Sequence, residues 1–170
     1  MNRKRLMILG ADQRVWYLNA HKMLVQRYGP NSGLMAGFVA STSVSASVAA
    51  NQALARKAYE QWRNQLPFRG YLSSVILNLE RTTANLPLNG LKVENFRQAL
   101  CGNLDAVVID RWMLRAYGLP RVIRPKRYME LSDVIKREAS RNGLKPAEYQ
   151  AMVWAGIRRT KRSNVENFSF

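Results

Sequence analysis

The chain of 170 residues is poor in cysteine and histidine, with one of each, Cys101 and His21. A single cysteine excludes an intramolecular disulfide. The two residues together are too few for a zinc or iron–sulfur site built from cysteine and histidine. The sequence therefore predicts no metal cluster and no cofactor, and a reducing compartment is the simplest setting for the protein.

Long apolar runs are also missing. No stretch approaches the roughly 20 apolar residues that a membrane span requires. The basic start MNRKRLMILGADQ contains an apolar run only from Leu6 to Leu9, which is shorter than the about 7 to 15 residues of a signal-peptide core. We therefore expect a soluble, intracellular protein without a membrane partner.

Acidic residues are scarce: 11 Asp and Glu stand against 27 Lys and Arg, which gives a formal net charge of +16. Such an excess repels itself in a compact chain, and its commonest use is to bind the phosphates of a nucleic acid. Ribosomal, virion and membrane-surface proteins can be equally basic. The charge thus predicts a polyanionic partner and says nothing about catalysis.

Hydrophobic residues are plentiful, at 47% of the chain, with four Trp and seven Tyr, so the chain folds around a core. Its length suits one domain. We expect a single helical domain over residues 1–170, with an N-terminal extension at 1–33 made of one short helix and a loop. A basic, irregular tail is expected at 160–170.

Helical spacing of apolar residues recurs along the chain, and no alternating strand pattern occurs, which predicts an all-α fold. Residues 41–47, STSVSAS, have the composition of a linker. Ser132 is the expected N-cap of a helix over 133–141. Trp62, Tyr149 and Trp154 are expected in the core. Further helices are predicted over 34–40, 55–66, 72–79, 93–100, 113–117 and from Pro146 to 157.

The segment LPLNGLKVENFRQALCGNLDAVVIDRWMLRAYG, from Leu86 to Gly118, is the most specific part of the sequence. A turn with Pro and Gly leads directly into a helix with Lys92 at its start, and Asp110 follows 18 positions later at the start of another helix. An aspartate at a helix start is often only a cap, where backbone N–H groups keep it ionised. Free N–H groups at the first helix start also favour an anion, and we expect a phosphate at Asn89, Gly90 and Leu91.

Two motifs in this segment resemble the helix-hairpin-helix DNA glycosylases of the endonuclease III type. That family carries L-P-G-V-G-x-K-T/V-A and then V-D-T-H-V-x-R-x-x-x-R-L-G, and this chain has L-P-L-N-G-L-K-V-E and V-I-D-R-W-M-L-R-A-Y-G. Upstream, GFVASTSVSASVAANQALARKAYE looks like the family's early helix, polar loop and next helix. The resemblance covers roughly residues 34–118 and implies a DNA-side loop that contains Ser41, Thr42 and Ser43.

The resemblance implies a catalytic pair. Asp110 matches the aspartate that stabilises positive charge developing on the sugar, and Lys92 matches the lysine that bifunctional members use as the nucleophile at C1′. A lysine attacks only as the neutral amine, which requires a lowered pKa. The implied activity is glycosidic bond cleavage in double-stranded DNA, with AP lyase activity through Lys92, in the cytoplasm of a bacterial or phage-infected cell.

Three departures separate the chain from the family pattern. Leu88 replaces the first glycine of the hairpin, Arg111 and Trp112 replace Thr and His, and the iron–sulfur cysteines are absent. The altered pattern resembles small phage-encoded members of the superfamily implicated in thymine hypermodification. Modification of an altered pyrimidine is therefore an alternative chemistry, and a non-catalytic DNA-binding or virion-associated protein is a third possibility.

DNA contacts are expected from basic residues, although charge runs are often only solvated faces. The tail adds the cluster Arg158, Arg159, Lys161 and Arg162. Trp112 is a candidate for stacking on an extruded base, with core packing as the alternative. His21 is expected to be a surface or capping group. The other expected contacts are Arg111, Arg115, Arg121, Arg124, Lys126 and Arg127.

Overall fold

The described residues form α-helices joined by turns, loops and one extended segment. The computed structural model describes residues 2–44, 46–161 and 165, and no strand occurs among them, so the predicted all-α class is confirmed. Two short 3-10 helices, η1 (Ala11–Gln13) and η2 (Gly29–Asn31), flank the second α-helix. The α-helices are α1 Arg3–Leu9, α2 Trp16–Tyr28, α3 Ser32–Thr42, α4 Val48–Arg63, α5 Ser73–Thr83, α6 Leu91–Leu100, α7 Arg111–Ala116, α8 Pro125–Arg141 and α9 Pro146–Thr160.

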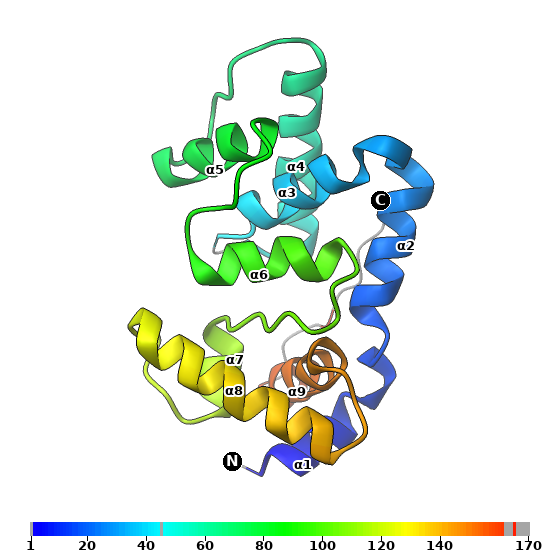
Figure 1. The fold of residues 1–170 in the computed structure, drawn as a ribbon, viewed down its shortest axis with the longest axis vertical. Helices are drawn as coiled ribbons and strands as arrows, with labels where there is room; N and C mark the ends of the chain where they lie inside the picture. Colours follow the sequence, from blue (N-terminus) through cyan, green and yellow to red (C-terminus); the bar gives the residue numbers. More distant parts are fainter. Residues whose placement is uncertain (1, 45, 162–164, 166–170) are drawn as a thin grey trace.

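Helices α2 to α6 form the first of two lobes, which fills the upper part of Figure 1. Helix α3 is central to it, because its residues from 35 to 42 are all apolar or small and all buried. Helices α2, α4, α5 and α6 pack around α3. The amphipathic helices thereby cover an apolar one, as their patterns require. Core side chains include Leu24, Phe38, Ala55, Leu79 and Leu100.

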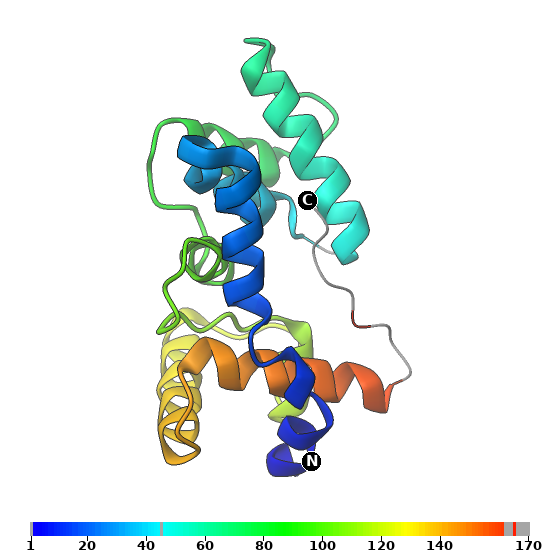
Figure 2. The ribbon, with the colours of Figure 1, turned by 90° about the vertical axis from the view of Figure 1, so that its right-hand side faces the viewer.

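Helices α1, α7, α8 and α9 form the second lobe, in the lower part of Figure 1. Helix α9 is central here and packs against the other three. Helix α2 runs along one side of the molecule from one lobe to the other, as Figures 1 and 2 show. Residues 101–110 cross back from α6 to α7. Core side chains include Leu6, Met113, Ile135, Val153 and Ile157.

The first 33 residues belong to both lobes, which corrects the prediction of a short helix and a loop in an N-terminal extension. Helix α1 packs on α9 at two glycines. A Cβ on Gly10 would overlap the carbonyl group of Met152, and a Cβ on Gly156 would overlap that of Leu6. Backbone therefore meets backbone, and α1 is an integral part of the second lobe.

Helix α8 begins at Pro125, eight residues before the predicted start at 133. Proline suits a first helical position, where its missing N–H would have no partner within the helix. Ser132 is therefore a buried residue inside α8, and its prediction as an N-cap is wrong. Within the predicted tail, only residues 160, 161 and 165 are described. Arg162 lies outside the described residues.

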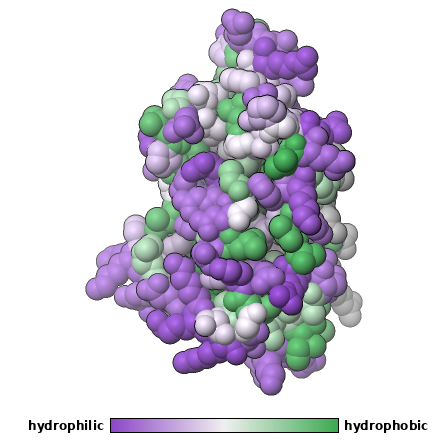
Figure 3. All heavy atoms as spheres, turned by 45° about the vertical axis from the view of Figure 1, so that its right-hand side comes forward, coloured by the Kyte–Doolittle hydropathy of each residue, from purple (hydrophilic) through white to green (hydrophobic). Residues whose placement is uncertain are grey.

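Hydrophilic side chains dominate the face drawn in Figure 3, and hydrophobic side chains form separate patches between them. This distribution is the ordinary one for a protein with its apolar residues in two cores. In the described part of the chain, no helix is both long enough and apolar enough to cross a membrane.

Candidate active site

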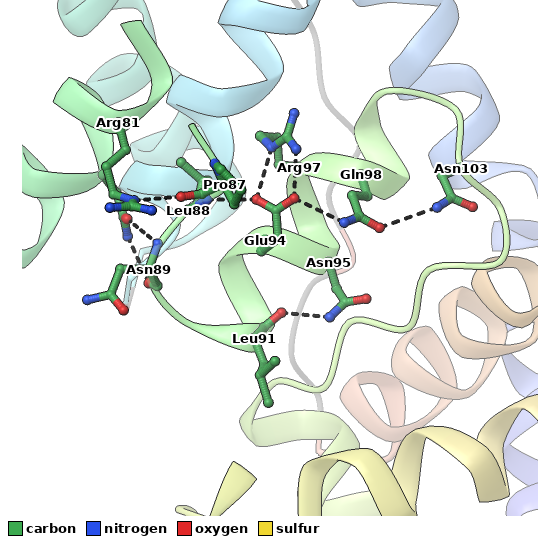
Figure 4. A network of polar contacts seen from close by, with 11 residues as sticks. Arg81, Pro87, Leu88, Asn89, Leu91, Glu94, Asn95, Arg97, Gln98 and Asn103 are labelled. Atoms are coloured by element: carbon green, nitrogen blue, oxygen red, sulfur yellow. Dashed lines mark hydrogen bonds and ion pairs between the residues drawn. The ribbon is translucent and has the colours of Figure 1, made fainter. Parts of the chain in front are cut away.

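The turn between α5 and α6 is a hairpin, residues 84–90, that Glu94 ties to α6 (Figure 4). The Glu94 carboxylate accepts a 2.8 Å hydrogen bond from the backbone N–H of Leu88 and further bonds from the side chains of Arg97 and Gln98. Burial raises the pKa of Glu94, but these hydrogen bonds outweigh burial, and the pKa lies below its ordinary value. A charged Glu94 therefore holds the hairpin in place.

Leu88 occupies a position where this hairpin does not need a glycine. The residues with positive φ are Asn85 (φ 52°) and Gly90 (φ 112°), whereas the Leu88 side chain is buried in the first lobe. Asn78 of α5 holds the neighbouring residue: its amide donates to Asn89 O and accepts from Asn89 N. The buried Leu88 side chain therefore anchors the hairpin to the core.

Lys92 follows the hairpin in the first turn of α6 and points toward the end of α3. Its Nζ donates to Ser43 Oγ at 2.6 Å and to Ser43 O at 3.3 Å, and lies 5.3 Å from the ring centroid of Phe96. The Ser43 hydroxyl in turn donates to Ala40 O. Burial lowers the pKa of Lys92 to about 8, against the opposing charge of Asp110. This lysine is the kind of amine that covalent catalysis uses.

Asp110 ends an extended segment that runs between the lobes. Residues 106–109 are buried and belong to no strand, so side chains must satisfy their backbone groups. The Tyr128 hydroxyl of α8 accepts one N–H of this segment and donates to one of its carbonyl groups. Gln150 of α9 accepts the N–H of Val108. Two helices of the second lobe thereby fix the approach to Asp110.

The Asp110 carboxylate is held at both oxygens. Asp110 is the N-cap of α7, and its Oδ1 accepts the backbone N–H groups of Trp112 and Met113, both at 2.9 Å. Its Oδ2 accepts the indole N–H of Trp154 at 2.9 Å. The predicted capping role is confirmed. The indole bond to the second oxygen is not part of a cap and orients the carboxylate plane.

Lys92 and Asp110 line one cavity of about 380 Å³ at the junction of the two lobes. Lys92 comes from the first lobe and Asp110 from the second, and their charges interact. The volume falls in the range of about 300–1,000 Å³ typical of small-molecule sites. The wall is strongly aromatic, with Trp16, Tyr17, Phe96, Trp112 and Trp154.

Trp112 lies among arginines at the edge of this cavity. The guanidinium carbons of Arg115, Arg158 and Arg111 lie 4.9, 5.7 and 5.8 Å from its ring centroid. Arg158 also lies 4.7 Å from the ring centroid of Trp154. Because Trp112 is only partly buried, one part of its indole packs on the second lobe while another borders the cavity.

The predicted loop 41–47 begins later than expected. Ser41 and Thr42 are the last residues of α3, both buried, and their hydroxyls donate to the carbonyl groups of Gly37 and Phe38. Burial removes these two residues from the surface, which corrects their prediction as DNA contacts. Ser43 does line the cavity. Ser45 lies outside the described residues.

The other predicted contact residues divide into three groups. Arg111, Trp112 and Arg121 line the cavity with the catalytic candidates. Arg115 lies beside Trp112 but does not line the cavity. The hairpin residues Asn89, Gly90 and Leu91 are exposed and lie outside the cavity lining. Arg124, Lys126 and Arg127 are exposed around the start of α8, where Arg127 pairs with Glu130 at 2.9 Å. The cavity therefore gathers only part of the predicted set.

Several cavity residues escape the sequence patterns. Trp16, Tyr17 and Gln150 come from α2 and α9, far from the Lys92 and Asp110 segment. Trp154 has the helical spacing of a core residue, and it does pack on the second core, but its indole N–H serves Asp110. A shared polar function between distant helices leaves no local signal in the sequence.

His21 takes no part in this site. Its Nδ1 lies 3.0 Å from the carbonyl oxygen of Leu100, the last residue of α6, so the predicted capping role is confirmed. Among the described residues, no group of three or more His, Cys, Asp and Glu side chains is arranged to hold a metal ion.

Comparison with known proteins identifies the family and no function. No curated protein and no solved structure matches the chain. A family of unknown function, DUF7178, matches residues 10–161, a range that includes every α-helix except α1 and every cavity residue named above. The chain belongs to the DUF7178 family of unknown function.

Proposed function

We propose that the protein is a DNA base-processing enzyme of the DNA glycosylase type, in which Asp110 and Lys92 act on the sugar of a nucleotide held in the cavity. The observation that carries the proposal is that these two side chains, one from each lobe, line the same aromatic cavity. The same pair is the one that the motif resemblance marks. A helix-hairpin-helix fold with its site between two helical lobes agrees with this arrangement.

Lys92 supplies the nucleophile. With a pKa of about 8 instead of 10.5, the neutral amine is roughly 300-fold more abundant at pH 7. The neutral Nζ attacks C1′, the bond between C1′ and the base breaks, and the base leaves with the bonding electrons and takes up a proton. Loss of a proton from the amine and opening of the sugar give a Schiff base, from which elimination of the 3′ phosphate cuts the strand.

Asp110 stabilises the positive charge that develops on the sugar as the base departs. Its three hydrogen-bond donors hold the carboxylate in one orientation before the reaction begins, so little reorganisation accompanies bond breaking.

The cavity lining suits an extruded base. Enzymes that act on a base in duplex DNA move the nucleotide out of the stack and bind it between aromatic or apolar side chains. Trp16 and Phe96 lie nearly parallel, at 20° and 6.4 Å, and Trp154 stands 6.2 Å from Trp16. The exposed hairpin and the exposed basic residues around the start of α8, outside the cavity, supply phosphate contacts to the duplex.

A single-turnover assay tests the proposal. Duplexes that each contain one damaged or hypermodified base are incubated with excess protein, and mass spectrometry detects free or altered base. We expect base release by the wild type and a fall of about 100-fold or more in Asp110→Asn. Asp105→Asn is the matched control, since Asp105 is an exposed aspartate outside the cavity, paired with Lys145.

The outcomes separate the candidate functions. Base release without strand cleavage indicates a glycosylase that does not use Lys92 as the nucleophile. A mass change on a base that stays attached indicates the base-modifying enzyme. If every base stays intact and Asp110→Asn binds DNA like the wild type, the enzyme proposal is wrong and a DNA-binding protein remains.

A further inference from the structure

A second hollow, of about 410 Å³, adjoins the cavity on the second lobe. Arg111, Trp112 and Arg121 line both spaces, so the two adjoin at these side chains. Arg115 lines the second hollow and not the cavity. Gly118 and Leu119 complete the lining, and none of the described residues that line it is a carboxylate. The second hollow is therefore a cationic site next to an aromatic one.

The three arginines of this hollow have no anionic partner in the part of the chain that the structure describes. Among the described residues, Arg111, Arg115 and Arg121 make neither an ion pair nor a hydrogen bond through their side chains. Elsewhere the same residue type binds a carboxylate, as in the pairs of Arg3 with Glu138, Arg14 with Glu148, Arg97 with Glu94 and Arg159 with Asp12. Three unpaired positive charges around one concavity repel each other, and a bound anion relieves that repulsion.

The indole of Trp112 fixes part of this cluster. The guanidinium groups of Arg115 and Arg111 lie against its ring, at 4.9 and 5.8 Å from the centroid. A guanidinium group that contacts a ring through its face keeps its N–H edge available for a hydrogen-bond acceptor. That edge matches two oxygens of a phosphate group. The chemistry of the hollow therefore selects a phosphate in preference to a halide or a single-point acceptor.

We propose that the second hollow binds the DNA phosphodiester that flanks the nucleotide in the cavity and so holds that nucleotide out of the duplex. This inference rests on the proposed function, because it places a base on one side of Trp112. An extruded nucleotide stays covalently joined to its two flanking phosphates, and a cationic site that shares Arg111, Trp112 and Arg121 with the base cavity captures one of them. Trp112 then separates the base from the phosphate.

Arg115→Ala tests the phosphate site without altering the cavity lining. The probe is a short duplex with one tetrahydrofuran abasic analogue, bound to the full-length protein. We expect the affinity to fall about tenfold. The slope of log K against log salt should shrink by about 1, as for one lost phosphate contact. Arg27→Ala, which removes an exposed arginine of α2 outside both spaces, is the matched control and should leave the affinity within about twofold.

Neutral methylphosphonate linkages locate the phosphate. One linkage at a time is replaced on either side of the analogue. At one of these positions the replacement should weaken the wild type about tenfold and Arg115→Ala hardly at all, because the contact is already missing. Arg115→Lys should keep the salt slope and lose part of the affinity, since lysine cannot bind two oxygens at once.

Two results would overturn the inference. One is that every methylphosphonate replacement weakens the binding of Arg115→Ala by the same factor as it weakens the binding of the wild type. The other is an equal loss of affinity in Arg27→Ala. The binding assay does not depend on base release. If Arg115→Ala and one methylphosphonate have non-additive effects on affinity but no base is released, the phosphate site is supported and the enzyme proposal is contradicted. If base is released but the effects are additive, the enzyme proposal is supported and the phosphate site is contradicted.

Discussion

The indole N–H of Trp154 donates a 2.9 Å hydrogen bond to Asp110 Oδ2, while the first turn of α7 binds Oδ1 of the same carboxylate. Helix α9 and helix α7 thus share one acidic side chain at the wall of the cavity. A residue that only capped α7 would need one oxygen. The second bond fixes the orientation of the Asp110 carboxylate at the cavity wall.

Asp110→Asn should separate stability from activity. Asparagine caps helices about as well as aspartate, but its amide group presents a donor to the Trp154 N–H, so we expect a loss of about 1–2 kcal/mol in the free energy of unfolding. Base release should fall by about 10²–10³-fold, since the charge is gone. Urea unfolding and single-turnover kinetics measure the two effects. Equal activity of variant and wild type would remove Asp110 from the mechanism.

Trp154→Phe should reduce activity through Asp110. The phenyl ring keeps most of the packing, whereas the hydrogen bond to Oδ2 is lost. We expect base release to fall about tenfold, as for a misoriented catalytic group, and DNA affinity to change little. In the Asp110→Asn background the same substitution should cost much less. Equal costs in the two backgrounds would mean that Trp154 acts only through packing.

Lys92 should impose a pH dependence on stability. Its pKa is about 8 in the folded protein and 10.5 in the unfolded chain, so between these values the unfolded chain binds the extra proton. Stability should therefore rise with pH from about 8 to 10.5. Lys92→Met should remove this rise and stabilise the protein at pH 7 by about 1–3 kcal/mol, because a charged amine no longer has to be buried.

The control for this prediction is Lys136→Met, which changes an exposed lysine of α8. It should leave the pH dependence of denaturant unfolding as in the wild type. A wild-type unfolding curve that is flat between pH 8 and 10.5, or a Lys92→Met variant that is less stable at pH 7, would show that Lys92 is charged at no cost.

Gly156→Ala should loosen the second lobe. The added Cβ would overlap the Leu6 carbonyl group in α1, and backbone cannot move aside as a side chain can. We expect a loss of about 1–3 kcal/mol. Gly33→Ala is the matched control: it adds a Cβ in open space at a helical position of α3 and should stabilise by about 0.4–1 kcal/mol. Thermal unfolding measures both, and equal stabilities would contradict the close packing of α1 on α9.

Long amphipathic helices could be predicted from the sequence because the apolar stripe of each helix is a local pattern of residues. The stripe in residues 55–66 corresponds to α4, and the stripe after Pro146 corresponds to α9. The segment at 1–33 was harder, since α1 contributes only Leu6 as a fully buried residue and has no stripe of its own. A cap signal was present, however: the Asn2 side chain accepts the N–H of Arg5.

The candidate site could be predicted only for residues that lie in one short, recognisable segment of the sequence. The spacing of Lys92 and Asp110 marks both residues, and the structure brings both to one cavity. Ser43 was expected for another reason, as part of a DNA-side loop, and proves to hold the amine. Trp154 and Gln150 could not be predicted, because they meet Asp110 and Val108 only after α9 has packed into the second lobe.

Borohydride trapping tests the central claim most directly. The wild type is mixed with a duplex that contains one abasic site, reduced, and digested to locate the adduct. The account predicts a covalent complex at Lys92 that increases from pH 6.5 to 8.5 as the amine with a pKa of about 8 becomes neutral. The complex should be absent in Lys92→Ala and present in Lys136→Ala. An adduct that persists in Lys92→Ala, or none in the wild type at any pH, would contradict Lys92 as the nucleophile.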